Sequence, residues 1–107
     1  MRVTYRLATN NLASVAAEAA WAENMGYNAM SSNETAHDSF LPLALAATST
    51  TRATLETRVA IAFPRSPMIT AYLARDLQDL SKGRFRLGLG TQVKGHIQRR
   101  FSTDWEA

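Results

Sequence analysis

The chain has 107 residues, of which 46% are hydrophobic and 20% charged, and this composition is typical of a globular protein rather than a disordered one. Its net charge of +3 is too small to indicate nucleic-acid binding without a clustered basic face, and the absence of cysteine excludes disulfide scaffolds, zinc–cysteine sites and thiol catalysis. Since no stretch resembles a signal peptide or a membrane span, we expect a soluble cytoplasmic protein.

The first part of the chain has the pattern strand, helix, strand. Residues 2–9 alternate apolar and polar side chains, which is the period of a strand. A helix is expected next, with Asn10 or Asn11 as its N-cap and Gly26 as its left-handed stop. The apolar residues of this helix that share one face are Leu12, Val15, Ala16, Ala19 and Ala22. Residues 27–32 form a weaker second strand.

The middle of the chain predicts a loop, a short helix and a third strand. The loop is the polar segment "NETAHDSF". A helix over roughly 41–50 follows, with Asp38 or Ser39 as its N-cap and Pro42 in its first turn. Residues 55–63 are the clearest strand, because they are rich in β-branched and aromatic side chains.

A third helix and a fourth strand complete the pattern. Ser66 fits the N-cap, Pro67 the first helical position and Gly83 the end of the helix. The expected apolar stripe of this helix consists of Ile69, Leu73, Leu77 and Leu80. Residues 84–90 return to the strand period, with Phe85, Leu87 and Leu89 on one face.

The order βαβαβαβ indicates an α/β fold with parallel strands and right-handed crossovers. Two architectures use this order: an open doubly wound sheet and the amino-terminal half of a (β/α)8 barrel. Four strands cannot close a barrel, which takes about eight. Since parallel strands are normally covered on both faces, the fourth strand, or whichever strand lies at the edge, is unfinished in this pattern. The pattern alone leaves both architectures open.

The loop after the second strand contains the densest titratable cluster, Glu34, His37 and Asp38. In either parallel architecture such loops gather at the carboxyl ends of the strands, where functional groups collect. The simpler interpretation is a helix entry, in which Asp38 caps the helix while Glu34 and His37 are solvated. A metal site is not expected, because the Glu-x-x-His spacing has no further ligands nearby.

Two further turns follow strands. In "AIAFPRSP", Pro64 and Pro67 stiffen a turn that either leads into the third helix or directs backbone groups at a bound ring. In "LGLGTQ", Gly88 and Gly90 permit close approach of a flat or phosphorylated ligand, or tight packing between strands. Both interpretations remain open for each turn.

Basic residues cluster near the fourth strand. Residues 82–86, "KGRFR", are best interpreted as a solvated face, because the aromatic pattern of an RNA-binding strand is incomplete. The later basic group can bind an anionic cofactor or substrate, and it comprises Lys94, His96, Arg99 and Arg100.

The segments "ETAHDSFLPLALAA" and "AIAFPRSPMITAYLARDLQDLSKGRFRLGLGTQVKGHIQRRF" resemble the luciferase-like monooxygenase superfamily. More narrowly, they resemble its deazaflavin-dependent oxidoreductases, which use coenzyme F-420. The resemblance implies a single (β/α)8 barrel domain, of which residues 1–107 are the amino-terminal part with strands 1–4 and helices 1–3. The carboxyl-terminal half would then be absent.

The same resemblance implies a deazaflavin ring, or alternatively FMN, across the carboxyl-end mouth of the barrel, exchanging a hydride with a small-molecule substrate. It assigns His37 as general acid/base, and the Ala62–Phe63 peptide as a bulge with a cis bond behind the ring. Ser66 and Thr91 match positions that hydrogen-bond the cofactor. The implied cofactor-binding set is Glu34, Ala62, Phe63, Ser66, Gly90, Thr91 and Gln92.

The chain also departs from its relatives. Those that act on sugar phosphates have a glutamate where this chain has Val93, so that substrate class loses support. The subgroup is expected to have tryptophan at the position of Ser31 and glycine at that of Glu56. Two rival interpretations remain: a non-catalytic half-barrel that forms a homodimer or binds a partner chain, and a small flavodoxin-like binding domain.

Overall fold

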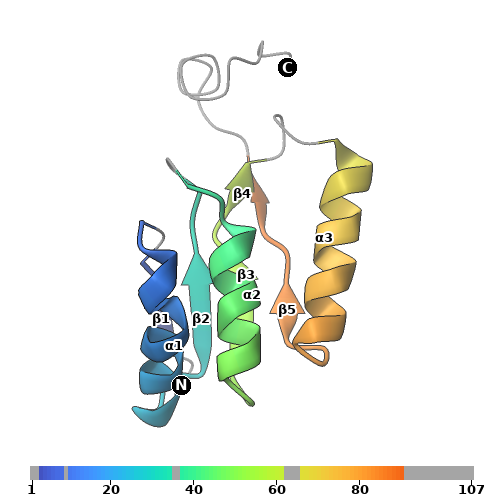
Figure 1. The fold of residues 1–107 in the computed structure, drawn as a ribbon. Helices are drawn as coiled ribbons and strands as arrows, with labels where there is room; N and C mark the ends of the chain where they lie inside the picture. The colour runs from blue at the N-terminus through green and yellow to red at the C-terminus, as the bar shows by residue number, and fades with distance from the viewer. Residues whose placement is uncertain (1–2, 9, 35–36, 62–65, 91–107) are drawn as a thin grey trace.

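The computed structural model of the chain describes residues 3–8, 10–34, 37–61 and 66–90, which form a parallel sheet covered by helices (Figure 1). Strands and helices alternate as predicted. The elements are β1 (Thr4–Arg6), η1 (Leu12–Ser14), α1 (Val15–Asn24), β2 (Ala29–Ser32), α2 (Phe40–Ser49), β3 (Thr54–Thr57), β4 (Ala60–Ile61), α3 (Pro67–Leu80), β5 (Phe85–Arg86) and β6 (Leu89–Gly90).

The main sheet has four strands in the order β1-β2-β3-β5, and every neighbouring pair is parallel. A second parallel pair, β4 and β6, lies beyond β3 and β5 at one end of the sheet (Figure 1). Because the strands follow one another in sequence order, the sheet has no point at which the winding reverses. This is the order of a barrel rather than that of a doubly wound sheet.

The third and fourth strands are each interrupted, whereas the sequence predicts continuous strands over 55–63 and 84–90. Pairing stops after Thr57 and resumes at Ala60, and the peptide between Arg58 and Val59 in this gap is cis. Across the gap the Thr57 hydroxyl accepts a hydrogen bond from the Gly88 N–H at 2.8 Å and donates one to the Gly88 carbonyl at 2.8 Å. A side chain therefore provides the hydrogen bonds that the interrupted ladder lacks.

The glycines of the fourth strand are required by tight packing between strands. A Cβ added at Gly88 would collide with the Thr57 carbonyl oxygen, and one added at Gly90 would lie 2.6 Å from Cγ2 of Val59. Of the two interpretations left open by the sequence, close strand packing thus has a direct structural basis.

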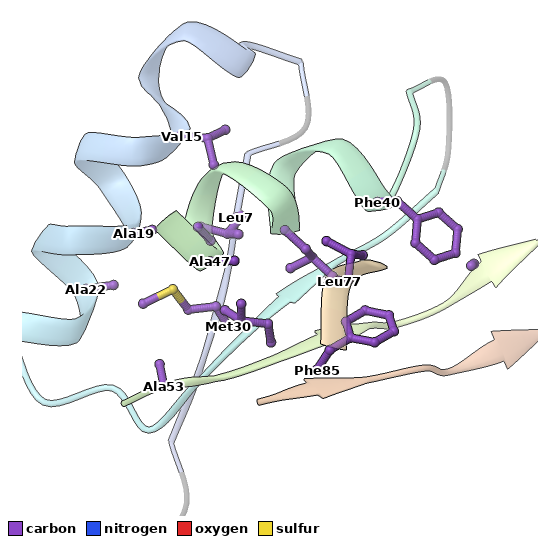
Figure 2. Close-up of a cluster of buried hydrophobic side chains, with 14 residues drawn as sticks. Leu7, Val15, Ala19, Ala22, Met30, Phe40, Ala47, Ala53, Leu77 and Phe85 are labelled. Carbon is purple, nitrogen blue, oxygen red and sulfur yellow. The ribbon is translucent and has the colours of Figure 1, made fainter. Parts of the chain in front are cut away.

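The hydrophobic core lies between the sheet and the helices. Tyr5, Met30, Leu55 and Phe85 occupy one cross-strand row on this face. Figure 2 shows Met30 and Phe85 from the strands among side chains of all three helices. A single core cluster contains residues of α1, α2 and α3, so the three helices cover the same face of the sheet. The fully or nearly fully buried members are Leu7, Val15, Ala19, Ala22, Met30, Phe40, Leu43, Ala46, Ala47, Ala53, Leu55, Ala60, Leu77 and Phe85.

The opposite face of the sheet carries a polar row. Arg6, Ser31, Glu56 and Arg86 are successive register partners across the four strands. Ser31 and Glu56, the two departures from the expected subgroup pattern, are therefore neighbours on adjacent strands. Arg58, which follows the end of β3, forms an ion pair with Glu56, with Nη1 and Oε1 3.7 Å apart.

Some predicted apolar positions are exposed. Leu12 is 39% exposed, because residues 12–14 form a 3-10 turn and Leu12 is not in phase with the buried stripe of α1. Asn11 is at the N-cap position of this turn, but its side chain makes no capping hydrogen bond. Gly26 has a φ of +102°, as its predicted role as a helix stop requires.

Predicted apolar positions are also exposed on α3 and at the β5–β6 edge of the sheet. Ile69 and Leu80 of the predicted α3 stripe are 51% and 46% exposed, and Leu87 and Leu89 are 39% and 50% exposed. Ile69 and Leu80 lie on α3, Leu87 lies between β5 and β6, and Leu89 lies on β6. β5 and β6 are edge strands, with no further strand of the described residues beside them. The sequence pattern predicted that these four side chains are buried in the core, and this prediction is wrong for the described residues.

Candidate functional site

The carboxyl ends of the parallel strands define the candidate site. β2, β4 and β6 end towards the same end of the molecule, and α2 and α3 begin there (Figure 1). The segments that follow these three strands are those in which the sequence predicts functional groups. Of these segments, residues 62–65 and 91–107 lie outside the described residues, so the structure characterises the site mainly through the β2–α2 connection.

Glu34 is buried rather than solvated, so that part of the helix-entry interpretation is wrong. Its side chain is 6% exposed, and Oε1 accepts a hydrogen bond from the backbone N–H of Ile61 at 2.7 Å. Glu34 is buried because its carboxylate extends from the segment after β2 to the buried backbone N–H of Ile61 in β4. Glu34 thus connects two of the strand ends that border the candidate site.

Asp38 caps α2, as predicted. Its Oδ2 accepts hydrogen bonds from the N–H groups of Phe40 at 2.7 Å and Leu41 at 2.6 Å, two donors that an α-helix leaves without internal partners. Ser39, the alternative cap, makes no capping hydrogen bond with its side chain. With Asp38 in this role, the neighbouring His37 is exposed at the rim.

Ser66 and Gly90 are the other predicted cofactor-binding residues that the structure describes. Ser66 is exposed and its Oγ accepts a hydrogen bond from the N–H of Ile69 at 3.1 Å, which confirms the predicted N-cap of α3. A hydroxyl that accepts in a cap retains its hydrogen for donation to another group. Gly90 is half-buried beside Val59.

The remaining predicted site residues lie outside the described part of the chain. They are Ala62, Phe63, Thr91 and Gln92 of the cofactor-binding set, Val93, and the basic residues Lys94, His96, Arg99 and Arg100.

Sequence reasoning missed two buried serines beside this site. Ser32 and Ser39 are fully buried, and neither hydroxyl has a hydrogen-bond partner among the described residues. They flank the segment that carries Glu34 and His37. No sequence signal distinguishes them from ordinary loop serines, because serine is common both in turns and at helix starts.

At the opposite, amino end of the sheet, buried polar groups serve the fold. Glu23 is 8% exposed and accepts hydrogen bonds from three consecutive backbone N–H groups, those of Thr51, Arg52 and Ala53. Burial by itself raises the pKa of Glu23, but these hydrogen bonds outweigh that effect, so its pKa is lowered from 4.5.

Arg84 shows that the solvated interpretation of residues 82–86 is wrong at this position. Its guanidinium accounts for five hydrogen bonds that join the ends of α2 and α3 to the start of β3. The acceptors are the carbonyls of Ala47, Thr50, Ala53 and Ser81 and the hydroxyl of Thr50. Its neighbours Lys82 and Arg86 are exposed, as predicted.

The described residues contain no cluster of three or more histidine, cysteine, aspartate or glutamate side chains able to hold a metal ion. None of their helices has the length and apolarity needed to cross a membrane.

Helices on one face of a singly wound parallel sheet, with polar segments after the strand ends, define part of a (β/α)8 barrel. The sequence profile of the Luciferase-like monooxygenase family matches residues 2–107, and the chain belongs to this family. The predicted α/β fold of luciferase-like barrels is therefore confirmed.

Among curated proteins, the chain is 50% identical over 96 residues to the uncharacterized protein Rv1360 of Mycobacterium tuberculosis (strain H37Rv) and to Mb1395 of Mycobacterium bovis. The match covers 90% of this chain but 28% of each relative, so the chain spans little more than a quarter of their length.

Solved structures of similar fold include monooxygenase RslO1 from Streptomyces bottropensis, with a TM-score of 0.82 and 18% identity over 97% of this chain and 37% of that one. The coenzyme F-420 dependent tetrahydromethanopterin reductase of Methanopyrus kandleri gives 0.80 and 24% identity, covering 92% and 29%. The oxygenating constituent of 3,6-diketocamphane monooxygenase of Pseudomonas putida, in complex with FMN, gives 0.78 and 17%, covering 92% and 32%. These likenesses concern the fold.

Proposed function

We propose that the chain is the amino-terminal part of a single luciferase-like barrel domain that transfers a hydride between a flavin-type ring and a small organic substrate. The observation that carries the proposal is the β2–α2 connection, in which His37 is exposed at the carboxyl end of the sheet while Glu34 and Asp38 hold the surrounding backbone. Catalytic groups of such barrels lie at this end of the strands.

In this proposal His37 is the general acid/base, a task suited to an imidazole near neutral pH. The ring, when bound, accepts or donates the hydride. The described residues fit such a group, because Ser66 is exposed and its hydroxyl keeps a hydrogen to donate. Glu34, Ala62, Phe63, Thr91 and Gln92 complete the proposed cofactor-binding set.

Coenzyme F-420 is the first choice of cofactor and FMN the second. The segment from Ala60 to Phe101 resembles the deazaflavin-dependent subgroup, and solved structures of similar fold include an F-420 dependent reductase and a monooxygenase in complex with FMN. The choice affects the reaction, because a carbon at ring position 5 transfers hydride but does not support the oxygen chemistry of a reduced flavin. Val93 argues against a sugar phosphate as the substrate.

Absorbance titration of the full-length protein with each cofactor separately tests the proposal. We expect saturable binding of coenzyme F-420, with weaker binding of FMN. Preferential binding of FMN would still support an oxidoreductase, with FMN rather than coenzyme F-420 as its cofactor. The absence of binding to either cofactor would overturn the assignment.

A second candidate is a non-catalytic half-barrel that self-associates as a homodimer. It is favoured by the exposed apolar side chains at both open edges of the sheet, such as Val3 and Trp21 beside β1 and Leu87 and Leu89 at β5–β6. Sedimentation of the protein over a range of concentrations distinguishes the two. The half-barrel predicts a concentration-dependent dimer without affinity for either cofactor.

A further inference from the structure

The hydrogen bond between Glu34 and Ile61 spans a gap in the sheet. β2 and β3 remain paired up to Ser32 and Thr57, and the last backbone bond between them runs from Arg58 N–H to the Ser32 carbonyl at 2.7 Å. Beyond this point β4 pairs with β6 in a sheet of two strands. The Glu34 carboxylate thus connects the segment after β2 to β4 where the described backbone ladder between them has ended.

This connection is buried and short. Glu34 is 6% exposed, Ile61 is fully buried, and Oε1 lies 2.7 Å from the Ile61 nitrogen. A carboxylate forms shorter and stronger hydrogen bonds than a neutral acceptor does, and a buried N–H that loses its acceptor is costly. The Glu34 side chain therefore helps to fix the position of Ile61 relative to β2.

Ile61 in turn links the ends of β4 and β6. It is the residue directly before Ala62 and Phe63, and it is the register partner of Gly90, the residue directly before Thr91. All four of these neighbours belong to the proposed cofactor-binding set. A displacement of Ile61 along the strand direction would move the ends of β4 and β6 together relative to His37.

We infer that Glu34 is a positioning residue: through Ile61 it fixes the ends of β4 and β6 relative to the β2–α2 connection and so sets the affinity of the site for its ring cofactor. This rests on the proposed function. It adds to the role that the family resemblance implies for Glu34, because the residue also acts through the backbone of β4.

The test uses three variants of the full-length protein: Glu34→Ala, Glu34→Gln and, as a matched control, Glu23→Ala. Glu23 is also a buried glutamate that binds backbone N–H groups of the third strand region, but at the amino end of the sheet. The measurements are the dissociation constant for coenzyme F-420 and FMN, the hydrogen exchange rate of the Ile61 amide, and the midpoint of chemical unfolding.

We expect Glu34→Ala to raise the dissociation constant of the preferred cofactor by about tenfold or more and to speed exchange at Ile61. Glu34→Gln keeps an amide oxygen that can accept from Ile61, so it should restore most of both properties. Glu23→Ala should lower the unfolding midpoint at least as much as Glu34→Ala does, with a dissociation constant within about twofold of wild type.

Three results would overturn the inference. The first is a cofactor affinity unchanged in Glu34→Ala despite faster exchange at Ile61. The second is a loss of affinity in Glu23→Ala equal to that in Glu34→Ala, which would indicate a purely structural role. The third is a wild type that binds neither cofactor, which removes the proposed function as well and is recognised before any variant is measured. If Glu34→Ala does not fold, the test is made with Glu34→Gln. In that variant, normal hydrogen exchange at the Ile61 amide together with a loss of cofactor affinity would contradict the inference.

Discussion

At the amino end of the sheet, Glu23 accepts from three consecutive backbone N–H groups and Arg84 donates to four carbonyls, so two charged side chains close off the backbone there. At the carboxyl end the corresponding charged residue, Glu34, accepts from the N–H of Ile61. His37 beside it is exposed.

The difference follows the division of work known in parallel β/α barrels, in which the amino end maintains stability and the carboxyl end carries function. Charged groups at the amino end of this chain are used to satisfy the ends of helices and strands. At the carboxyl end, Glu34 and Asp38 accept hydrogen bonds from backbone N–H groups, whereas His37 is exposed to solvent. Substitutions at the two ends should therefore change different measured quantities.

The largest effect is expected from His37→Gln at the carboxyl end. If His37 is the general acid/base, kcat for hydride transfer should fall by about a hundredfold to a thousandfold. Because the side chain is exposed, the free energy of unfolding should change by less than about 0.5 kcal/mol. Steady-state kinetics and chemical unfolding of the same preparation check this. An unchanged kcat would remove His37 from the chemistry.

At the amino end, Arg84→Met should lower the free energy of unfolding by about 3 kcal/mol, because it leaves several carbonyls at the ends of α2 and α3 without their donor. Lys82→Met is the matched control, since Lys82 is exposed and two residues away, and it should change stability by less than about 0.5 kcal/mol. Urea unfolding measures both. Equal effects of the two substitutions would contradict the structural role of Arg84.

Glu23→Gln should cost about 2 kcal/mol near neutral pH and less in acid. The pKa of Glu23 is lowered from 4.5 in the folded protein, so its stabilisation is complete above that value and is lost as the pH falls through the lowered pKa. The gap in unfolding free energy between wild type and variant should therefore be full at neutral pH and narrow as the pH falls below 4.5. Glu18→Gln, which affects a single backbone bond to Ala8, should show a smaller gap. A gap independent of pH would mean that the charge of Glu23 is not what stabilises β3.

The periodic features of the fold could be predicted from the sequence. Alternation marked the strands, and the serine–proline pair at residues 66–67 marked the start of α3. The single winding of the sheet could not be read from the pattern, because it depends on which face each helix covers. The gap after Thr57 was hidden for a similar reason: a side chain replaces backbone pairing across it, and no local preference marks that exchange.

For the candidate site, the sequence located the segment but not the roles of its residues. Asp38 was predicted as a cap because the backbone N–H groups that donate to it are near in sequence. Glu34 could not be predicted to hold Ile61, since its partner is 27 residues away and belongs to a different strand. Glu23 and Arg84 were missed for the same reason, because charged residues are ordinarily expected in solvent unless long-range backbone partners are known.

The smallest predicted effect tests whether the carboxyl end contributes any stability of its own. Asp38→Ala removes the acceptor of two N–H groups at the start of α2 and should cost about 1 kcal/mol, the usual value for a helix cap. Asp76→Ala, on the exposed side of α3, should change stability by less than about 0.5 kcal/mol. Because Asp38 adjoins His37, the cofactor affinity of Asp38→Ala should be measured alongside its unfolding. A large loss of cofactor affinity with a loss of stability of only about 1 kcal/mol would mean that the cap also positions the His37 imidazole. Substitutions at the carboxyl end would then affect cofactor binding more than folding, in contrast to those at the amino end.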